Sequence, residues 1–244
     1  MPGRLEDPKV NIFLVGTFDP NAVLPDKLGE AGVIRKDEAA AARFRGLLPG
    51  QVTDFALEWC TVTVIRERFV VETREPPFVK ICDLVQKTLR ELMPHATLTF
   101  MGINRIYSIK FDSASERDAL GVRLVPPANW GMWGRQIREK IDAASDLKHG
   151  GMTSAAMREH PIPGRPGGWR DVTITPDFAS SPAAPAAIIS LNDHFQVDET
   201  EIPASLKADE IPQHRTTTLM HLLAEQFEQS INNLEVIAQD VLHG

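Results

Sequence analysis

The sequence is poor in cysteine. It contains two cysteines in 244 residues, Cys60 and Cys82, and no Cys-x-x-Cys pair. Disulfide scaffolds are short and dense in cysteine, and zinc ribbons and thioredoxin-type sites need closely spaced pairs. All three classes are therefore excluded. Both cysteines have apolar neighbours in the sequence, which predicts buried thiols. Cys60 lies in a predicted strand, where its thiol is expected to be protonated and inert.

Long hydrophobic runs are also missing. The longest run near the N-terminus covers residues 12–15, and residues 1–9 are mostly polar. A membrane-spanning helix needs about 20 apolar residues, and a signal peptide needs an apolar core. We therefore expect a cytoplasmic protein with no membrane partner.

Basic residues are outnumbered by acidic ones. The chain has 26 Lys and Arg against 33 Asp and Glu, a net charge of −7. Nucleic-acid-binding proteins typically carry a basic excess or a basic stripe. The densest basic stretch, residues 66–74, is interleaved with glutamates and is typical of a solvated hairpin. The composition argues against a nucleic-acid partner.

Common catalytic motifs are absent as well. The chain has no Gly-x-x-x-x-Gly-Lys-Ser/Thr loop, no Gly-x-Gly-x-x-Gly turn and no Gly-x-Ser-x-Gly elbow. The glycines in residues 164–168 lie among prolines and indicate a flexible loop. These absences favour a non-enzymatic protein, and no cofactor is expected.

Histidines offer weak candidates for a metal site. His221 and Glu225 lie four residues apart, so a helix places both on one face, and His214 can join them if the helix begins early. Zinc needs three or four ligands, so a solvated helix face is the favoured interpretation. The pair Asp193 and His194, at the end of a predicted strand, is likewise interpreted as surface.

A fragment of a nuclease pattern also occurs. Asp146 and Lys148 match part of the Asp/Glu-x-Lys pattern in which acids hold Mg²⁺, and Asp112 is the best-placed second acid. Such fragments arise by chance in a chain of this length. A metal-dependent hydrolase or nuclease is therefore the third function hypothesis.

The hydrophobic pattern that is present predicts both strands and helices. Alternating or continuous apolar runs predict strands within residues 10–18, 53–75, 97–111, 152–157, 169–175 and 187–197. Apolar stripes, alanine content or caps predict helices over residues 38–48, 78–92, 113–120, 130–144 and 217–242. Gly102 is interpreted as a bulge, Ser113 with Glu116 as a capping box, and Thr216 to Thr218 as N-caps.

The order of these elements predicts an α+β fold, in which antiparallel sheets are packed by amphipathic helices. Residues 53–111 are predicted to form two strands, a helix and a further strand, and residues 146–242 three strands and a long helix. We expect two α+β halves, residues 1–125 and 126–244, with one compact unit as the alternative. The last helix is long enough that it must lie across a sheet or against a partner.

The same order resembles a family of sporadically distributed, functionally uncharacterised bacterial proteins. The likeness rests on the hairpin over residues 62–71, a Gly-x-Asn-Arg-Ile stretch (residues 102–106), the strand over residues 187–193, and a long C-terminal helix with His221 and Phe227. It covers about two thirds of the chain. The resemblance implies a fold with two sheet-plus-helix halves, and no activity or functional residue.

The most unusual local feature is the pair Trp130 and Trp133, flanked by glycines after two prolines. The favoured interpretation places Trp133 in the core and Trp130 against the start of a helix. The alternative is an exposed platform, since tryptophan is enriched at interface hot spots.

The leading function hypothesis is therefore a non-enzymatic interaction or assembly module that binds another protein or itself. The second is a small-ligand-binding protein with an apolar pocket between the sheet and the C-terminal helix.

Overall fold

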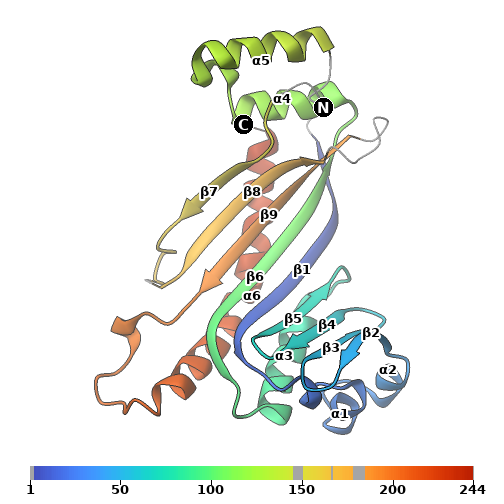
Figure 1. The fold of residues 1–244 in the computed structure, drawn as a ribbon, viewed down its shortest axis with the longest axis vertical. Helices are drawn as coiled ribbons and strands as arrows, with labels where there is room; N and C mark the ends of the chain where they lie inside the picture. Colours follow the sequence, from blue (N-terminus) through green and yellow to red (C-terminus); the bar gives the residue numbers. More distant parts are fainter. Residues whose placement is uncertain (1–2, 145–150, 166, 178–184, 244) are drawn as a thin grey trace.

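The computed structural model describes residues 3–144, 151–165, 167–177 and 185–243, whose strands form one antiparallel sheet (Figure 1). The nine strands of these residues lie in the order β2-β3-β4-β5-β1-β6-β9-β8-β7. The strands are β1 (Arg4–Thr17), β2 (Arg43–Leu48), β3 (Val52–Ala56), β4 (Thr61–Ile65), β5 (Arg68–Thr73), β6 (Thr97–Lys110), β7 (Ala155–Glu159), β8 (Trp169–Asp177) and β9 (Ala186–Phe195). The helices are α1 (Pro25–Glu30), α2 (Lys36–Ala40), α3 (Val79–Leu92), α4 (Ala114–Leu124), α5 (Gly131–Ala144) and α6 (Ile211–His243). The predicted α+β class with a long C-terminal helix is confirmed.

Helix α6 lies along one face of the central strands (Figure 1). On β6 the side chains of Met101, Ile103 and Ile109 are buried, whereas Asn104 and Ser108 between them are partly exposed. Successive side chains of a strand point to opposite faces. One face of the sheet is therefore packed against helices and the other is open, and the expectation that the long helix crosses a sheet is confirmed.

Two apolar clusters fill the space between the sheet and the helices, and α6 contributes to both. The buried apolar side chains of α6 are Leu219, Leu222, Leu223, Phe227, Ile231, Leu234, Ala238 and Leu242. Strand β6, which precedes residue 125, pairs with β9, which follows it, so both expected halves contribute to one sheet. Within the described residues, no helix combines the length and the apolar character needed to cross a membrane.

The prediction of a helix over residues 38–48 is wrong in its second part. Helix α2 ends at Ala40, and β2 pairs with β3 through a turn in which the Gln51 amide donates to the Leu48 carbonyl at 2.9 Å. Phe44 lies opposite Phe55, with ring centroids 6.3 Å apart. Helix propensity is a weak preference, and pairing with a neighbouring strand outweighs it here.

The predicted bulge is also misplaced. Gly102 pairs regularly with Phe13, and the irregular steps of this pairing lie between Glu6 and Lys9 and between Val15 and Gly16. A β carbon at Gly16 would collide with the carbonyl of Thr97. The close approach of two backbones therefore requires a glycine at residue 16, and residue 102 marks no irregularity.

One predicted helix cap is confirmed and the other is wrong. The hydroxyl of Ser113 accepts a hydrogen bond from the Glu116 amide at 3.2 Å and caps α4, which confirms the Ser113 half of the predicted capping box. The Glu116 carboxylate accepts from the Asp112 amide at 3.1 Å, one residue before the position that a capping box uses. Thr216 lies inside α6, where its hydroxyl donates to the Pro212 carbonyl and accepts from the Leu98 amide, each at 2.9 Å. Thr216 therefore ties α6 to the start of β6 and does not begin the helix.

Candidate functional site

The two tryptophans noted in the sequence lie at the start of α5. Trp130 ends a 3-10 helix, η2 (Pro127–Trp130), and Trp133 lies in the first turn of α5. Their rings meet edge to face with centroids 5.6 Å apart. The residues are 56% and 60% exposed, so the interpretation of Trp133 as a core residue is wrong, whereas Trp130 does lie at the start of α5. Helix α5 packs mainly against η2 and away from the sheet, so Trp133 has no core to enter.

Two glycines set this arrangement. Gly131 has a φ of 63°, in the left-handed region that favours glycine, and it separates η2 from α5. A β carbon at Gly134 would collide with the carbonyl of Pro127, so glycine lets α5 approach the backbone of η2. The chain thus folds back on itself with Trp130 and Trp133 beside the neighbouring cavities.

Two adjoining cavities share Val125, Trp130 and Ser154 in their walls. The smaller, here named the helix pocket, has about 280 Å³ and lies between residues 151–154 and the side chains of Trp133 and Ile137. The larger, here named the edge pocket, has about 600 Å³ and lies between the β7–β8 edge of the sheet and α6. Its apolar walls are Leu124, Val125, Trp130, Ala155, Ala156, Met157, Val172, Ile174, Ile237 and Val241. An apolar pocket in this place is what the second function hypothesis requires.

The edge pocket is charged at one end. Arg170 lies opposite Glu159 of β7 and Asp193 of β9 in the register of the sheet. Its Nη1 atom donates to Oε2 of Glu159 at 3.1 Å, and its Nε atom donates to Oδ1 of Asp193 at 2.6 Å. Asp193 is 0% exposed, so its interpretation as a surface residue is wrong. It faces α6 from a strand inside the sheet, where a buried carboxylate needs a charged partner.

A second cluster lies on the opposite face of the same strands. The ring of His194 stacks on Trp169 with centroids 3.6 Å apart, and the guanidinium of Arg158 lies 5.2 Å from the Trp169 ring. Arg158 also donates two hydrogen bonds of 2.7 Å to Asp171. Burial lowers the pKa of His194 to about 4, opposed by the Asp171 carboxylate and reinforced by Arg158, so the ring is neutral near neutral pH.

Sequence reasoning missed this cluster and interpreted His194 as a surface residue, whereas the structure half-buries it. Its members come from β7, β8 and β9. Alternation along each strand places Trp169 and Asp171 on one face, but only the strand register brings them to His194 and Arg158.

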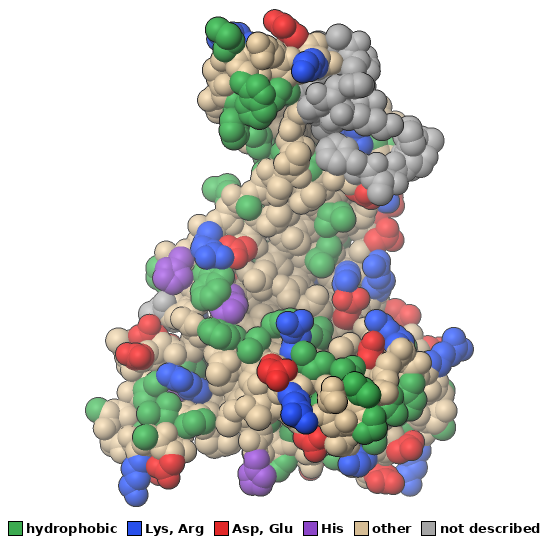
Figure 2. All heavy atoms as spheres, viewed as in Figure 1, with side chains coloured by type: hydrophobic (Ala, Val, Ile, Leu, Met, Phe, Trp, Pro, Cys, Tyr) green, Lys and Arg blue, Asp and Glu red, His purple; other side chains and the backbone are tan. Residues whose placement is uncertain are grey.

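The open face of the sheet is polar in its centre. Asn11, Asn104 and Asn192 lie opposite one another on β1, β6 and β9, and the Asn104 amide donates to Oδ1 of Asn11 at 2.6 Å. Figure 2 shows few hydrophobic or charged side chains over the middle of this face. The open face therefore differs from the α6 face, where apolar packing dominates.

The candidate metal ligands meet on the surface of α6. Nε2 of His221 lies 3.1 Å from Oε1 of Glu225, and the two side chains are 73% and 44% exposed. The other Glu225 oxygen lies 3.1 Å from Nη2 of Arg165. Among the residues that the structure describes, no group of three His, Cys, Asp or Glu is placed to hold a metal ion. Glu225 therefore forms an ion pair with Arg165 and a polar contact with His221 on the surface of α6.

The nuclease fragment falls largely beyond the described parts of the chain. Asp146 and Lys148 lie outside the described residues. Asp112 is exposed, and its carboxylate lies 3.6 Å from the guanidinium of Arg4. The geometry therefore adds no support for joint Mg²⁺ binding by these side chains.

Both cysteines are buried thiols, as the sequence predicts. Burial raises the pKa of Cys60 to about 12, with the nearby Glu38 carboxylate adding to the effect. Burial also raises the pKa of Cys82 to about 11, partly opposed by a hydrogen bond from Gln86. Because the thiolate is the nucleophile, both side chains are inert near neutral pH.

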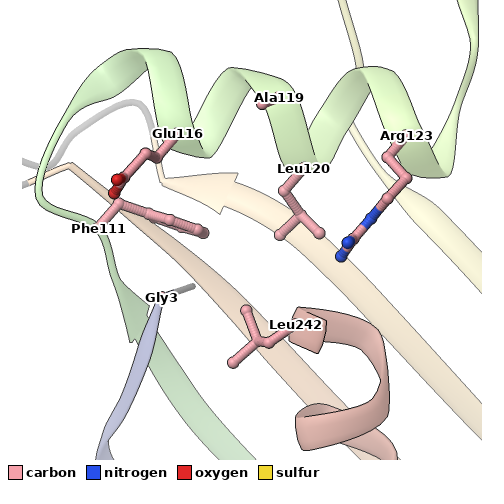
Figure 3. Close-up of a pocket in the computed structure, with 7 residues that line it drawn as sticks. All are labelled: Gly3, Phe111, Glu116, Ala119, Leu120, Arg123 and Leu242. Carbon is pink, nitrogen blue, oxygen red and sulfur yellow. The ribbon is translucent and has the colours of Figure 1, made fainter. Parts of the chain in front are cut away.

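A further cavity of about 250 Å³ lies where the chain before β1, helix α4 and the end of α6 meet (Figure 3). Its apolar walls are Phe111, Ala119, Leu120 and Leu242. Arg123 donates a hydrogen bond to the carbonyl of Val241, and the Glu116 carboxylate accepts one of 3.1 Å from the Asp112 amide. The polar side chains of this cavity serve contacts within the chain, which indicates a structural junction.

Comparison with known proteins identifies no relative. No family model matches the chain, and a search of curated proteins finds no match. The resemblance to the sporadically distributed bacterial family therefore stays a prediction. The tryptophan pair and the two adjoining cavities are the features of the structure that bear on function.

Proposed function

We propose that the protein binds a small apolar or amphipathic molecule in the edge pocket. The observation that carries this proposal is the cavity of about 600 Å³ between the β7–β8 edge and α6. Ligand pockets in proteins have about 300–1,000 Å³, mainly apolar walls and a few polar groups. The size of the edge pocket, its apolar walls and its single charged end match that description.

The walls of the pocket also suit a flexible apolar ligand. Met157 of β7 is 80% exposed at the edge of the sheet, and methionine adapts its shape to what it contacts. Burial of one methylene group contributes about 0.8 kcal/mol, and association opposes binding by at least about 4 kcal/mol. A ligand must therefore bury at least about five methylene groups before binding is favourable.

The proposal predicts that filling the pocket abolishes binding of an apolar probe. Ile237 is half-buried in the α6 wall, so Ile237→Trp places an indole inside the cavity. We expect N-phenyl-1-naphthylamine, a neutral fluorophore, to bind the wild type and to bind this variant at least about tenfold more weakly, or about 1.4 kcal/mol. Fluorescence titration measures both affinities.

The matched control is the neighbouring residue on the same helix. Val236 is 61% exposed, so Val236→Trp adds the same indole to the solvent side of α6. Its affinity for the probe should equal that of the wild type. A wild type that fails to bind the probe, or an equal loss in both variants, contradicts the pocket.

A second candidate function is a non-enzymatic interaction or assembly module of the cytoplasm, supported by an exposed apolar patch. Trp130, Met132 and Trp133 are 56%, 68% and 60% exposed at the start of α5. Monomeric proteins rarely expose large side chains of this kind together, and tryptophan is a frequent anchor of interfaces. An apolar patch is complementary to itself about a two-fold axis, so a second copy of this chain is the partner proposed.

Self-association through this patch has a direct test. Met132→Ser together with Trp133→Ser should shift the wild-type dimer to monomer in sedimentation equilibrium, because the variant loses the apolar surface that drives association. Met157→Ser, which changes an 80% exposed methionine on β7, is the control and should leave the dimer intact. A monomeric wild type at the highest soluble concentration rules out this candidate.

A further inference from the structure

The charged end of the edge pocket indicates which head group its ligand carries, and this inference rests on the proposed ligand-binding function. The guanidinium of Arg170 bridges two carboxylates, Glu159 at 3.1 Å and Asp193 at 2.6 Å. One positive group thus faces two negative groups, and the formal charge of the trio is negative. A third carboxylate would add repulsion there.

The other cation in the pocket wall does not change this balance. Arg158 makes two hydrogen bonds of 2.7 Å to Asp171, so its charge is matched on the opposite face of the sheet. The remaining wall residues of the pocket are uncharged. A ligand head group at this end of the pocket therefore meets the negative charge of the Glu159–Arg170–Asp193 trio.

Glu159 is the member of the trio that a ligand can reach. Its side chain is 46% exposed, whereas that of Asp193 is 1% exposed. Arg170 engages Oε2 of Glu159, and among the described residues no hydrogen bond to its Oε1 atom is present. A carboxylate oxygen accepts hydrogen bonds and cannot donate them when ionised. The end of the pocket thus presents an acceptor with negative charge beside an apolar cavity.

We propose that the edge pocket selects an amphipathic amine, whose apolar body fills the cavity and whose ammonium group donates to Glu159. An alcohol of the same length supplies the donor without the charge. A carboxylate of the same length meets repulsion from the trio. Attraction of the amine and repulsion of the carboxylate add in the comparison, so the two ligands should differ about tenfold in affinity, or about 1.4 kcal/mol.

The test is competition against N-phenyl-1-naphthylamine by decylamine, decanol and decanoate, each below its aggregation threshold. The wild type should bind the amine most tightly and the carboxylate about tenfold more weakly. Glu159→Gln removes one negative charge at the exposed end of β7 and keeps a side chain of the same size. In that variant the affinities of amine and carboxylate should come within about twofold of each other.

Glu228→Gln is the matched control, since Glu228 is an exposed carboxylate of α6 outside the pocket wall. It should keep the wild-type order of affinities. If no ligand displaces the probe from the wild type, the proposed ligand-binding function fails. Three other outcomes overturn the head-group inference but leave the proposed pocket intact. All three ligands displace the probe equally, decanoate binds best, or Glu159→Gln keeps the wild-type ratio of amine to carboxylate affinity.

Discussion

Replacement of Arg170 by methionine is expected to lower the free energy of unfolding by about 3–5 kcal/mol. Asp193 is 0% exposed and has its Oδ1 atom 2.6 Å from Nε of Arg170. The variant leaves this carboxylate in the interior without its charged partner, and uncompensated buried charge is strongly destabilising. Urea denaturation at neutral pH, followed by circular dichroism, measures the loss.

Two further variants separate loss of the buried pair from loss of an arginine as such. Arg158→Met removes an arginine whose side chain is 60% exposed, and it should lower stability by no more than about 1 kcal/mol. Arg170→Met combined with Asp193→Leu removes both charges and should recover most of the lost stability. Equal losses in Arg170→Met and Arg158→Met contradict the assigned role of the buried pair.

Replacement of Phe227 by alanine is expected to lower the free energy of unfolding by about 3–5 kcal/mol. Phe227 is 2% exposed on the sheet-facing side of α6 and belongs to the larger apolar cluster. Truncation removes the buried ring and leaves a cavity that the packed sheet cannot fill by relaxing. Thermal and urea unfolding measure the change.

The control for Phe227 is the same substitution at an exposed phenylalanine. Phe44 lies on the edge strand β2 and is 52% exposed, so Phe44→Ala should cost much less, about 1 kcal/mol or below. A loss at residue 44 as large as that at residue 227 contradicts the assignment of Phe227 to the core.

The Arg170 and Phe227 variants also bear on the proposed pocket. Helix α6 supplies Ile237 and Val241 to the wall of the edge pocket, and Arg170 lies at its charged end. Phe227→Ala weakens the attachment of α6 outside the pocket, whereas Arg170→Met changes the pocket itself. Under conditions where both variants remain folded, only Arg170→Met should alter the affinity for amphipathic ligands.

The local pattern of the sequence was sufficient for most helices. The apolar positions Ile81, Leu84, Val85 and Leu89, spaced by three and four residues, predict the helix over residues 78–92, and all four are at most 5% exposed in α3. The period of a helix is set by near neighbours in the chain, so it can be read without knowing the fold. Pairing between strands is not local, and for that reason residues 43–48 were assigned to a helix.

The candidate site could be predicted only in part from the sequence. Trp130 and Trp133 stand out by composition, but their environment depends on α5 packing against η2 and not against the sheet. The edge pocket needs the β7–β8 edge and the last turns of α6, which are far apart in the chain. Residue spacing in the sequence cannot predict such contacts, because the order of strands in the sheet brings these residues together.

The sequence by itself determined the α+β class, the long apolar stripe of α6, the acidic balance and the absence of common catalytic motifs. Each of these depends on composition or on short-range periodicity. Only the tertiary structure decided that Asp193 is buried against Arg170, 23 residues away, and that Trp130 borders a cavity. The physical reason is that strand register and helix packing decide which distant side chains lie together in the low-dielectric interior. This environment determines whether a charged or aromatic residue lies on the surface, in the core or in a binding site.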